Sequence, residues 1–475
     1  MRTWRVRVRD GSAICVPASP SYLTTYVLLE QEDWFEKEIA FVRRVIEPGM
    51  RAIDIGANFG IYTSVLARGV GPQGHVWALE PASTTLEYLR ETIASNGFSQ
   101  VEVVRLALSA HSGVATLGID RNSELNSLSV VPGQPTEEVP VETLDAFAAA
   151  AGLTRIDFVK LDAEGEELRI LGAGQHFLQA ESPLVMFEVK AGTKHNEGLP
   201  TAFRELGYEI YRLVGPDRLL VPCAAGETLD AYELNLFACK PERASHLAAR
   251  GLLARAYGAA ESPNSGAGVA LCAAQAFAPA LPAALSQAPS SYAQALDAYA
   301  LWRDETASSD IRAAALRSAL AKSCIAAQES QSSAVLSTAA RIADEAGARS
   351  LAVELLAALL SRLQQGGAPE HPCWPACPRY DHAAVASDTH TWLLAAAAEA
   401  YVMRVSFSGY FSKTLCAPLL DWLQNTPYAS PATERRRQLT ALHAGKQQQL
   451  RPSPLLQASS VDHLNPELWN AGGGG

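Results

Sequence analysis

Apolar residues follow two different spacings along this chain. Up to about residue 242, short apolar runs rich in β-branched residues alternate with segments whose apolar residues recur every three or four positions. The runs are typical of buried strands and the segments of amphipathic helices, so their alternation predicts an α/β fold with a doubly wound sheet. We expect strands at residues 53–55, 75–80, 101–105, 114–119, 139–142, 158–161 and 183–188, followed by runs at 208–213, 219–221 and 233–239 that suit an antiparallel addition to a parallel sheet.

The pattern before the first sheet strand is less regular. Residues 1–34 read as short strands and loops that pack on the domain that follows. A helix is expected at 33–46, because its apolar residues share one face and Pro48-Gly49 comes directly after it. Since this helix leads into the first strand, Glu36 and Glu38 lie either on a solvated helix face or toward a ligand site.

From about residue 243 the strand-like runs disappear and alanine becomes abundant. The remaining pattern predicts an all-α domain, built as a helical repeat or a bundle, which could bind a protein partner or a second copy of the chain. The expected helices are 244–257, 269–285, 292–303, 311–328, 332–345, 350–363, 389–405, 410–423 and 432–450. The chain is thus divided into residues 1–34, 35–242, 243–450 and a flexible tail at 451–475.

Composition excludes some partners. The net charge is −11, and residues 1–250 carry 23 basic against 33 acidic residues, whereas nucleic-acid binding needs a basic surface. Eight scattered cysteines do not form a disulfide framework, which suits a reducing compartment. The N-terminus lacks the apolar core of a signal peptide, and no uncharged apolar run is long enough for a membrane span. We therefore expect a cytoplasmic protein that binds no nucleic acid.

The stretch Arg51–Thr63 joins an apolar run to a helical pattern through a turn that contains Gly56 and Gly60. Glycine permits positive φ and close approach of a ligand, and the start of a helix offers unpaired N–H groups. Glu80 ends the next strand, where an acid commonly binds ribose hydroxyls. These features predict a ligand of nucleotide type.

Two cofactors compete for this turn, and a purely structural turn is a third reading. A nicotinamide dinucleotide needs Gly-x-Gly-x-x-Gly, but Asn58 stands where that pattern has its middle glycine. The carboxylate of Asp54 would also repel a pyrophosphate. A carboxylate instead suits the cationic end of S-adenosylmethionine. We therefore expect S-adenosylmethionine as the cofactor.

Further candidate residues follow later strands. Asp162 and Glu164 come directly after the run at 158–161, and Glu188 ends the run at 183–188, so all three should lie on the ligand edge of the sheet. His195 lies in the loop that follows. The loop at 107–109 is placed to cover an adenine, which makes Ser109 a cofactor candidate. The polar segment 121–135 is either a lid or a surface excursion.

These motifs together resemble the FkbM family of S-adenosylmethionine-dependent methyltransferases. The resemblance covers roughly residues 35–240 and rests on motifs in a common order: Asp54-Ile-Gly-Ala-Asn-Phe-Gly60, Glu80-Pro81, Glu142-Thr-Leu-Asp145 and Lys160-Leu-Asp-Ala-Glu-Gly165. It implies a seven-stranded class I methyltransferase fold and O-methylation of a hydroxyl on a sugar, a polyketide or another secondary metabolite. By similarity, Asp54, Gly56, Asn58 and Gly60 would hold the methionine end of the cofactor and Glu80 its ribose, with Asp162 and Glu164 on the reaction side.

Methyl transfer to oxygen is an in-line displacement that needs positioning and removal of the hydroxyl proton. We expect Asp162 as the base, with His195 second, and assign no metal ligand. A divalent ion held by Asp162, Glu164 and Glu188 is an alternative. A zinc site at His371, Cys373, Cys377 and His382 is another, although the prolines around these cysteines favour an ordered loop.

Two rival functions stay open at this point. One is methylation of nitrogen or of a peptide-borne group. The other is a cofactor-binding scaffold of low turnover that acts through its helical domain. The leading prediction is an O-methyltransferase acting on a small-molecule or carbohydrate acceptor.

Overall fold

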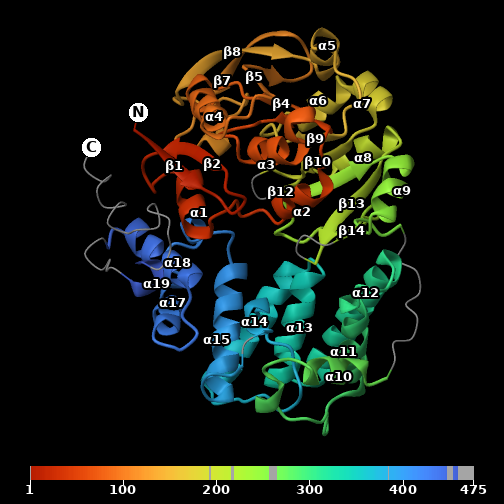
Figure 1. Cartoon of the computed structure of the whole chain (residues 1–475), viewed down its shortest axis with the longest axis vertical. Coiled ribbons are helices and arrows are strands. Elements are labelled where there is room, and N and C mark those ends of the chain that lie inside the picture. Colours follow the sequence, from red (N-terminus) through yellow and green to blue (C-terminus); the bar gives the residue numbers. More distant parts are fainter. Residues whose placement is uncertain are drawn as a thin grey trace.

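The protein consists of an α/β part and a helical part that lie against each other (Figure 1). The computed structural model describes residues 2–191, 194–215, 219–255, 265–382, 384–446 and 453–457. Most of the predicted tail at 451–475, and the ends of the helices expected at 244–257 and 432–450, lie outside the described residues. Within the described chain, no helix combines the length and the apolar character needed to cross a bilayer.

An eight-stranded sheet forms the centre of the α/β part. Its spatial order is β14 (Leu219–Pro222), β13 (Glu209–Val214), β15 (Asn235–Cys239), β10 (Leu184–Glu188), β9 (Phe158–Leu161), β3 (Arg51–Ile55), β4 (His75–Leu79) and β5 (Val101–Val104). The strands from β10 to β5 are parallel, whereas β15 runs antiparallel to both of its neighbours. This order confirms the doubly wound prediction, and β14 adds an eighth strand to the seven that the resemblance implies.

Helices cover both faces of this sheet. On one face the apolar residues of α2 (Glu38–Val45), α3 (Ile61–Val70) and α9 (Pro241–Ala249) pack on Ala52 and Val76, and α4 (Ser83–Asn96) packs on Ala78. On the other face Ile53 and Ile55 contact the apolar layer of four helices, α5 (Leu144–Ala150), α6 (Glu167–Gly172), α7 (Gln175–Glu181) and α8 (Gly198–Glu205). Because each strand is buried on both faces, its carboxyl end at one sheet edge is where ligands have access.

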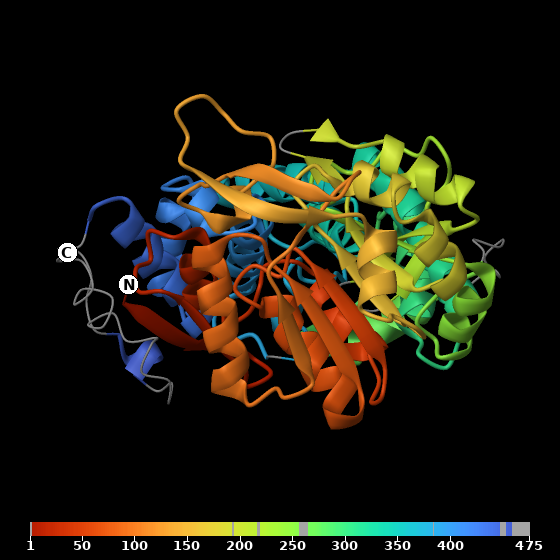
Figure 2. The ribbon, with the colours of Figure 1, turned by 90° about the horizontal axis from the view of Figure 1, so that it is seen from above.

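A second, three-stranded sheet lies beside the carboxyl ends of the large one (Figure 2). It contains β6 (Ala107–Leu108), β7 (Gly113–Gly118) and β8 (Thr136–Glu142), which confirms the strands expected at 114–119 and 139–142. The polar connection between β7 and β8 turns back on itself, because Gly118 pairs with Ser127. A short pair, β11 (Lys190–Ala191) and β12 (Lys194–His195), follows β10.

The N-terminal prediction was wrong in one respect. Strands β1 (Thr3–Arg7) and β2 (Ala13–Pro17) are followed by a helix, α1 (Leu23–Gln31), where loops were expected. Every residue from Leu23 to Glu30 is buried, so the helix has no polar face and no amphipathic period. The helix expected at 33–46 begins only at Glu38, because the preceding residues form part of a cavity wall instead.

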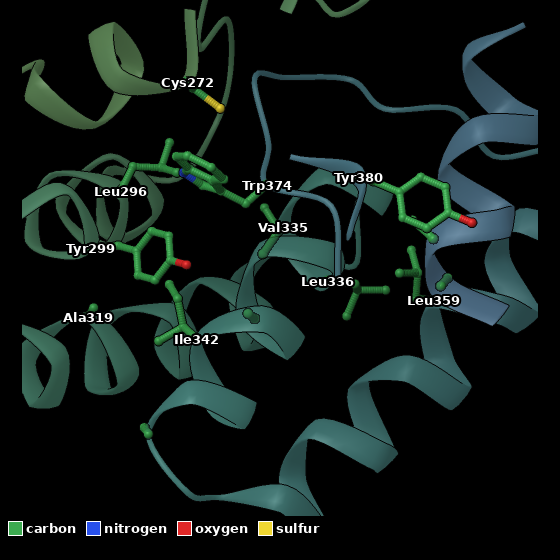
Figure 3. Packing of buried hydrophobic residues seen from close by; sticks show 14 of the residues in the cluster. Cys272, Leu296, Tyr299, Ala319, Val335, Leu336, Ile342, Leu359, Trp374 and Tyr380 are labelled. Atoms are coloured by element: carbon green, nitrogen blue, oxygen red, sulfur yellow. The ribbon is translucent and has the colours of Figure 1, made fainter. Parts of the chain in front are cut away.

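The helical part confirms most of the predicted segments. It contains α10 (Ala267–Ala273), α11 (Ser290–Arg303), α12 (Ser309–Glu329), α13 (Ser333–Glu345), α14 (Arg349–Gln364), α15 (Thr389–Arg404), α16 (Gly409–Ser412), α17 (Ala417–Gln424), α18 (Pro431–His443) and α19 (Pro454–Gln457). Trp374 lies in its core together with Tyr299 and Tyr380 (Figure 3). The edge strand β14 is covered by this core, which also contains Leu219 and Val221.

A buried polar cluster joins the two ends of the described chain. The Glu30 carboxylate at the end of α1 forms an ion pair with Arg436 of α18, with an N–O distance of 3.1 Å. The same carboxylate accepts hydrogen bonds from the Ser408 hydroxyl at 2.6 Å and from the Gly409 N–H at 2.9 Å. Figure 1 shows α1 beside α18, and the two helices are in contact. Glu30 therefore fixes the connection after α15 against the α/β part.

We expect Glu30→Gln to lower the free energy of unfolding by about 3–5 kcal/mol, because it leaves the Arg436 charge buried without its partner. Urea unfolding followed by circular dichroism measures this. Glu47→Gln is the control, since Glu47 is 52% exposed in its pair with Arg250 and should change stability by about 1 kcal/mol or less. Equal losses in the two variants would contradict the role given to Glu30.

Candidate active site

A cavity of about 550 Å³ opens at the carboxyl ends of β3, β4, β9 and β10. This volume lies in the usual range for small-molecule sites. Its lining comes from the sheet edge, the connection between β7 and β8, the segment before α2 and the connection after α15. The α/β part and the helical part therefore build it together.

Asp54 lies at the bottom of the cavity and has one oxygen without a hydrogen bond. The side chain is fully buried, and Oδ2 accepts a hydrogen bond of 2.6 Å from the Thr63 hydroxyl on α3. Oδ1 has no hydrogen-bond partner among the described residues. Burial raises the pKa of Asp54, and the Lys160 ammonium, 3.9 Å from Oδ1, opposes this effect. The unpartnered oxygen can accept a hydrogen bond from a cationic ligand.

The glycines of the turn are required by the protein's own backbone. Gly56 has a φ of +78°, and a Cβ there would lie 1.9 Å from the carbonyl oxygen of Asp162. Gly60 has a φ of +88° and precedes the first turn of α3. Asn58 adopts a φ of +49°, and its side-chain oxygen accepts a hydrogen bond of 2.8 Å from Ser123. The turn therefore packs directly against the strand end that carries Asp162.

Glu80 lines the cavity at the end of β4. Its two oxygens accept hydrogen bonds from the backbone N–H groups of Asn58 at 3.0 Å and Ala82 at 2.9 Å. Burial raises the pKa of Glu80 to about 7. A carboxylate can accept about four hydrogen bonds, so the remaining lone pairs can still accept hydroxyl groups of a sugar.

Ser109 does not line the cavity. Its hydroxyl donates a hydrogen bond of 2.5 Å to Glu166, and Glu166 is the residue of this pair that faces the cavity. The neighbouring wall is apolar and comes from residues 106–108. The loop expected at 107–109 thus contributes Ala107 and Leu108 to the lining, whereas the cofactor role of Ser109 stays a prediction.

Three carboxylates meet at the ends of β9 and β10. Oxygens of Asp162, Glu164 and Glu188 all lie within 4.8 Å of one another, as their positions after the strands predicted. Lys160 donates a hydrogen bond of 2.8 Å to Asp162. Burial raises the pKa of Glu164 and of Glu188, and the charge of Asp162 raises both further. This arrangement can bind a cation or take up a proton.

His195 and Glu38 were also candidates, but neither lies at the cluster of three carboxylates. His195 does not line the cavity, and its Nε2 lies 3.0 Å from the carbonyl oxygen of Glu233. Glu38 faces a separate cavity of about 170 Å³ between the two parts. Within the described residues, ligand atoms gather closely enough for a metal ion only at Asp162, Glu164 and Glu188, so the residues from His371 to His382 do not form the zinc site that was one alternative.

Glu36 is part of the cavity wall rather than of a solvated helix face. Its carboxylate accepts hydrogen bonds from Tyr62 at 2.6 Å, Trp34 at 3.0 Å and Asn235 at 3.1 Å. Burial raises its pKa, and the Asp162 charge adds to this effect. The position of Glu36 shortly before the first strand of the sheet was the sequence feature that indicated a place at the ligand site rather than on a solvated face.

Sequence reasoning missed Lys160 and the two phenylalanines Phe407 and Phe411. Lys160 pairs in register with Asp54 on the adjacent strand, so both side chains point to the same side of the sheet. A buried lysine inside an apolar run was a usable signal, since lysine is rarely buried without a partner. Phe407 and Phe411 line the cavity from the helical part, where nothing in the local pattern distinguishes them from core residues.

Comparison with protein families identifies the domain that carries the turn at Gly56 and the carboxylates of the strand ends. Residues 54–210 match the family model described as the methyltransferase FkbM domain. This segment begins at Asp54 and includes the turn, Glu80, the second sheet and the three carboxylates.

Curated relatives and solved structures are more distant. A protein-L-isoaspartate O-methyltransferase of Methanothermobacter thermautotrophicus is 32% identical over 59 residues, which are 12% of this chain and 27% of that protein. A protein-L-isoaspartate O-methyltransferase of Methanothrix thermoacetophila is 25% identical over 97 residues, which are 20% of this chain and 43% of that protein. The chain thus spans less than half the length of these relatives. A methyltransferase FkbM structure from Methylobacillus flagellatus has 17% identity and a TM-score of 0.28 over 43% of this chain and 50% of that one.

The raised pKa of Glu80 predicts a specific pH dependence of stability. Between 4.5 and about 7 the folded protein keeps a proton on Glu80 that the unfolded chain releases, so the free energy of unfolding falls as pH rises through this window. Glu80→Gln removes this loss. We expect the free energy of unfolding of the variant, relative to that of the wild type, to be higher at pH 8 than at pH 5 by on the order of 2–3 kcal/mol. Urea unfolding at both pH values measures it, with the exposed Glu87→Gln as control. Parallel pH profiles for wild type and Glu80→Gln would contradict the assignment.

Proposed function

Because residues 54–210 form a methyltransferase FkbM domain, we propose that this protein transfers a methyl group from S-adenosylmethionine to a hydroxyl group of a small acceptor. The observation that carries the proposal is Oδ1 of Asp54, a buried carboxylate oxygen of the cavity that accepts no hydrogen bond from the described residues, although the Lys160 ammonium lies 3.9 Å away. A buried polar atom without a partner is costly, and a ligand ammonium group would satisfy it.

The other cofactor contacts follow from the order of the strands. Asp54 would hold the amino group of the cofactor and Glu80 its ribose hydroxyls, while the apolar residues 106–108 would contact the adenine. Gly56, Asn58 and Gly60 form the turn between these groups. The side chain of Asn58 accepts a hydrogen bond from Ser123, which holds the connection between β7 and β8 next to this turn. S-adenosylmethionine supplies an electrophilic methyl group on a positively charged sulfur, which suits a cavity rich in carboxylates.

The acceptor lies, in this proposal, beside the carboxylates of β9 and β10. We expected Asp162 as the base, and its place in the cavity supports a role on this side. Its charge, however, is already matched by Lys160 at 2.8 Å. Among the described residues no group donates a hydrogen bond to the Glu164 carboxylate, and burial raises its pKa to about 9. Its deprotonated form, whose population grows as pH rises toward 9, is therefore the stronger proton acceptor. We therefore propose that Asp162 orients the acceptor and that Glu164 removes the hydroxyl proton.

A divalent cation held by Asp162, Glu164 and Glu188 is the alternative way to activate the hydroxyl. Hard cations bind oxygen ligands, and the three carboxylates converge closely enough to share one. In that case the ion would lower the pKa of the hydroxyl group directly.

Asp54→Asn tests the cofactor part of the proposal. Loss of a hydrogen bond between charged groups costs about 1.5–3 kcal/mol, so the dissociation constant of S-adenosylmethionine should rise roughly 10- to 150-fold. Isothermal titration calorimetry measures it, with the exposed Glu87→Gln as a matched control. Unchanged affinity in Asp54→Asn would reject Asp54 as the cofactor anchor, and no binding to the wild type would reject the cofactor.

Glu164→Gln tests the base. We expect kcat to fall by roughly 10²–10⁴, the usual contribution of a general base, while the cofactor dissociation constant stays within about twofold. Transfer of a labelled methyl group to a panel of alcohols measures both, with Glu197→Gln on the surface as control. Activity should also persist in EDTA. Loss in EDTA that Mg²⁺ restores would instead establish the metal alternative.

A further inference from the structure

The acceptor side of the cavity is closed by aromatic side chains from two distant segments. Trp34 and Phe35 precede α2, whereas Phe407 and Phe411 follow α15. The ring centroids of Phe35 and Phe407 are 5.3 Å apart, and those of Phe35 and Phe411 are 6.4 Å apart. We call these four side chains the aromatic wall.

Hydrogen bonds place this wall on the acceptor side. Glu36, the neighbour of Phe35, is bonded to Tyr62 on α3 and to Asn235 on β15. Since β15 lies next to β10, the residues before α2 extend across the strands that end in Asp162 and Glu188. The cofactor carboxylates Asp54 and Glu80 belong to β3 and β4, farther along the sheet.

The two rings from the helical part are fixed in place. Gly409 lies between them, and a Cβ at this residue would be 2.6 Å from the hydroxyl of Tyr26 on α1. The Glu30 carboxylate binds Ser408 and Gly409, as described above. The Arg349 guanidinium stacks on the Phe407 ring at 4.5 Å. These contacts hold the wall in position without a bound acceptor.

The charge of the cavity restricts what can bind there. Among the described residues that line it, eight carry a carboxyl group and two carry an amine. Both amines are engaged, Lys160 with Asp162 and Lys190 with the carbonyl oxygen of Ala231. No lysine of the described lining is therefore left to pair with a phosphate or carboxylate group of an acceptor, even where burial keeps Glu164 and Glu188 protonated. Aromatic rings, in turn, attract apolar ring faces and cations.

We propose that the helical part completes the aromatic wall with Phe407 and Phe411, and that the acceptor that binds to this wall is a non-acidic, ring-bearing alcohol. Its apolar ring face lies on Phe407 and Phe411, and its hydroxyl group faces Glu164. This inference rests on the proposed function for the identity of the acceptor side. It assigns to the helical part a role in substrate choice in addition to any role in binding partners.

Three matched probes test the charge of the acceptor. They are phenyl β-D-glucopyranoside, its 2-amino-2-deoxy analogue and phenyl β-D-glucuronide, which are neutral, basic and acidic at neutral pH. Saturation-transfer NMR on the full chain with S-adenosylhomocysteine measures their binding. We expect the neutral and basic probes to bind at least fivefold more tightly than the acidic one. Equal binding of the acidic probe, or no binding of any probe, would overturn the proposal.

Phe411→Ala tests the wall itself. Phe411 is 48% exposed, so the variant should fold, and Leu415→Ala, at a residue 62% exposed on the same segment but outside the cavity lining, is the control. We expect a fivefold or greater loss of probe binding in Phe411→Ala, recovery in Phe411→Tyr, no change in Leu415→Ala and unchanged cofactor affinity in all three. Probe binding that is insensitive to Phe411→Ala would overturn the proposal.

Failure of the proposed function gives a different result. If S-adenosylhomocysteine does not bind to the wild type by calorimetry, the cofactor assignment fails. The same probes and variants, measured on the protein without cofactor, then still decide whether the aromatic wall binds a non-acidic ring.

Discussion

The buried ammonium of Lys160 is the interaction on which the arrangement of this site depends. It lies within 2.8 Å of Asp162 and 3.9 Å of Asp54, and 5.1 Å above the ring of Tyr62. Without a cation at this point, the carboxylates of neighbouring strands would repel one another in a volume with little water. The coupled charges of Asp54, Asp162 and Glu36 in turn keep the pKa of Lys160 above its ordinary value, although burial alone would lower it. The lysine thus lets the sheet edge carry a net negative charge.

Much of the fold could be predicted because the central strands are buried on both faces. Such strands appear in the sequence as uninterrupted apolar runs, and the acids that follow them meet at one edge by the geometry of a parallel sheet. Asp54, Glu80, Asp162 and Glu188 were brought together for this reason. An antiparallel addition to the parallel sheet was also expected from the last apolar runs, although β14 extends the sheet beyond the expected seven strands.

Other features depend on contacts that no local pattern encodes. Helix α1 is enclosed on all sides, so hydrophobic spacing could not distinguish it from a strand. His195 follows the right strand, but a hydrogen bond to the Glu233 carbonyl directs it elsewhere. Gly56 looked like a ligand-binding glycine, yet its closest constraint is the backbone of Asp162. Phe407 and Phe411 belong to the helical part, and tertiary contacts bring them to the cavity, among them the hydrogen bonds that Glu30 accepts from Ser408 and Gly409.

The contact between Glu30 and Ser408 spans 378 positions of the chain. Contacts between residues so far apart form late, because the entropy of closing a long loop must be overcome before the contact contributes. During synthesis, the nucleotide-binding sheet can therefore reach its native form well before the connection after α15 exists. A folding chain would then acquire its cofactor-binding edge first and its means of discriminating between acceptors last. If the protein acts as proposed, this order of assembly gives it a stage at which it can hold a cofactor but cannot yet choose a substrate.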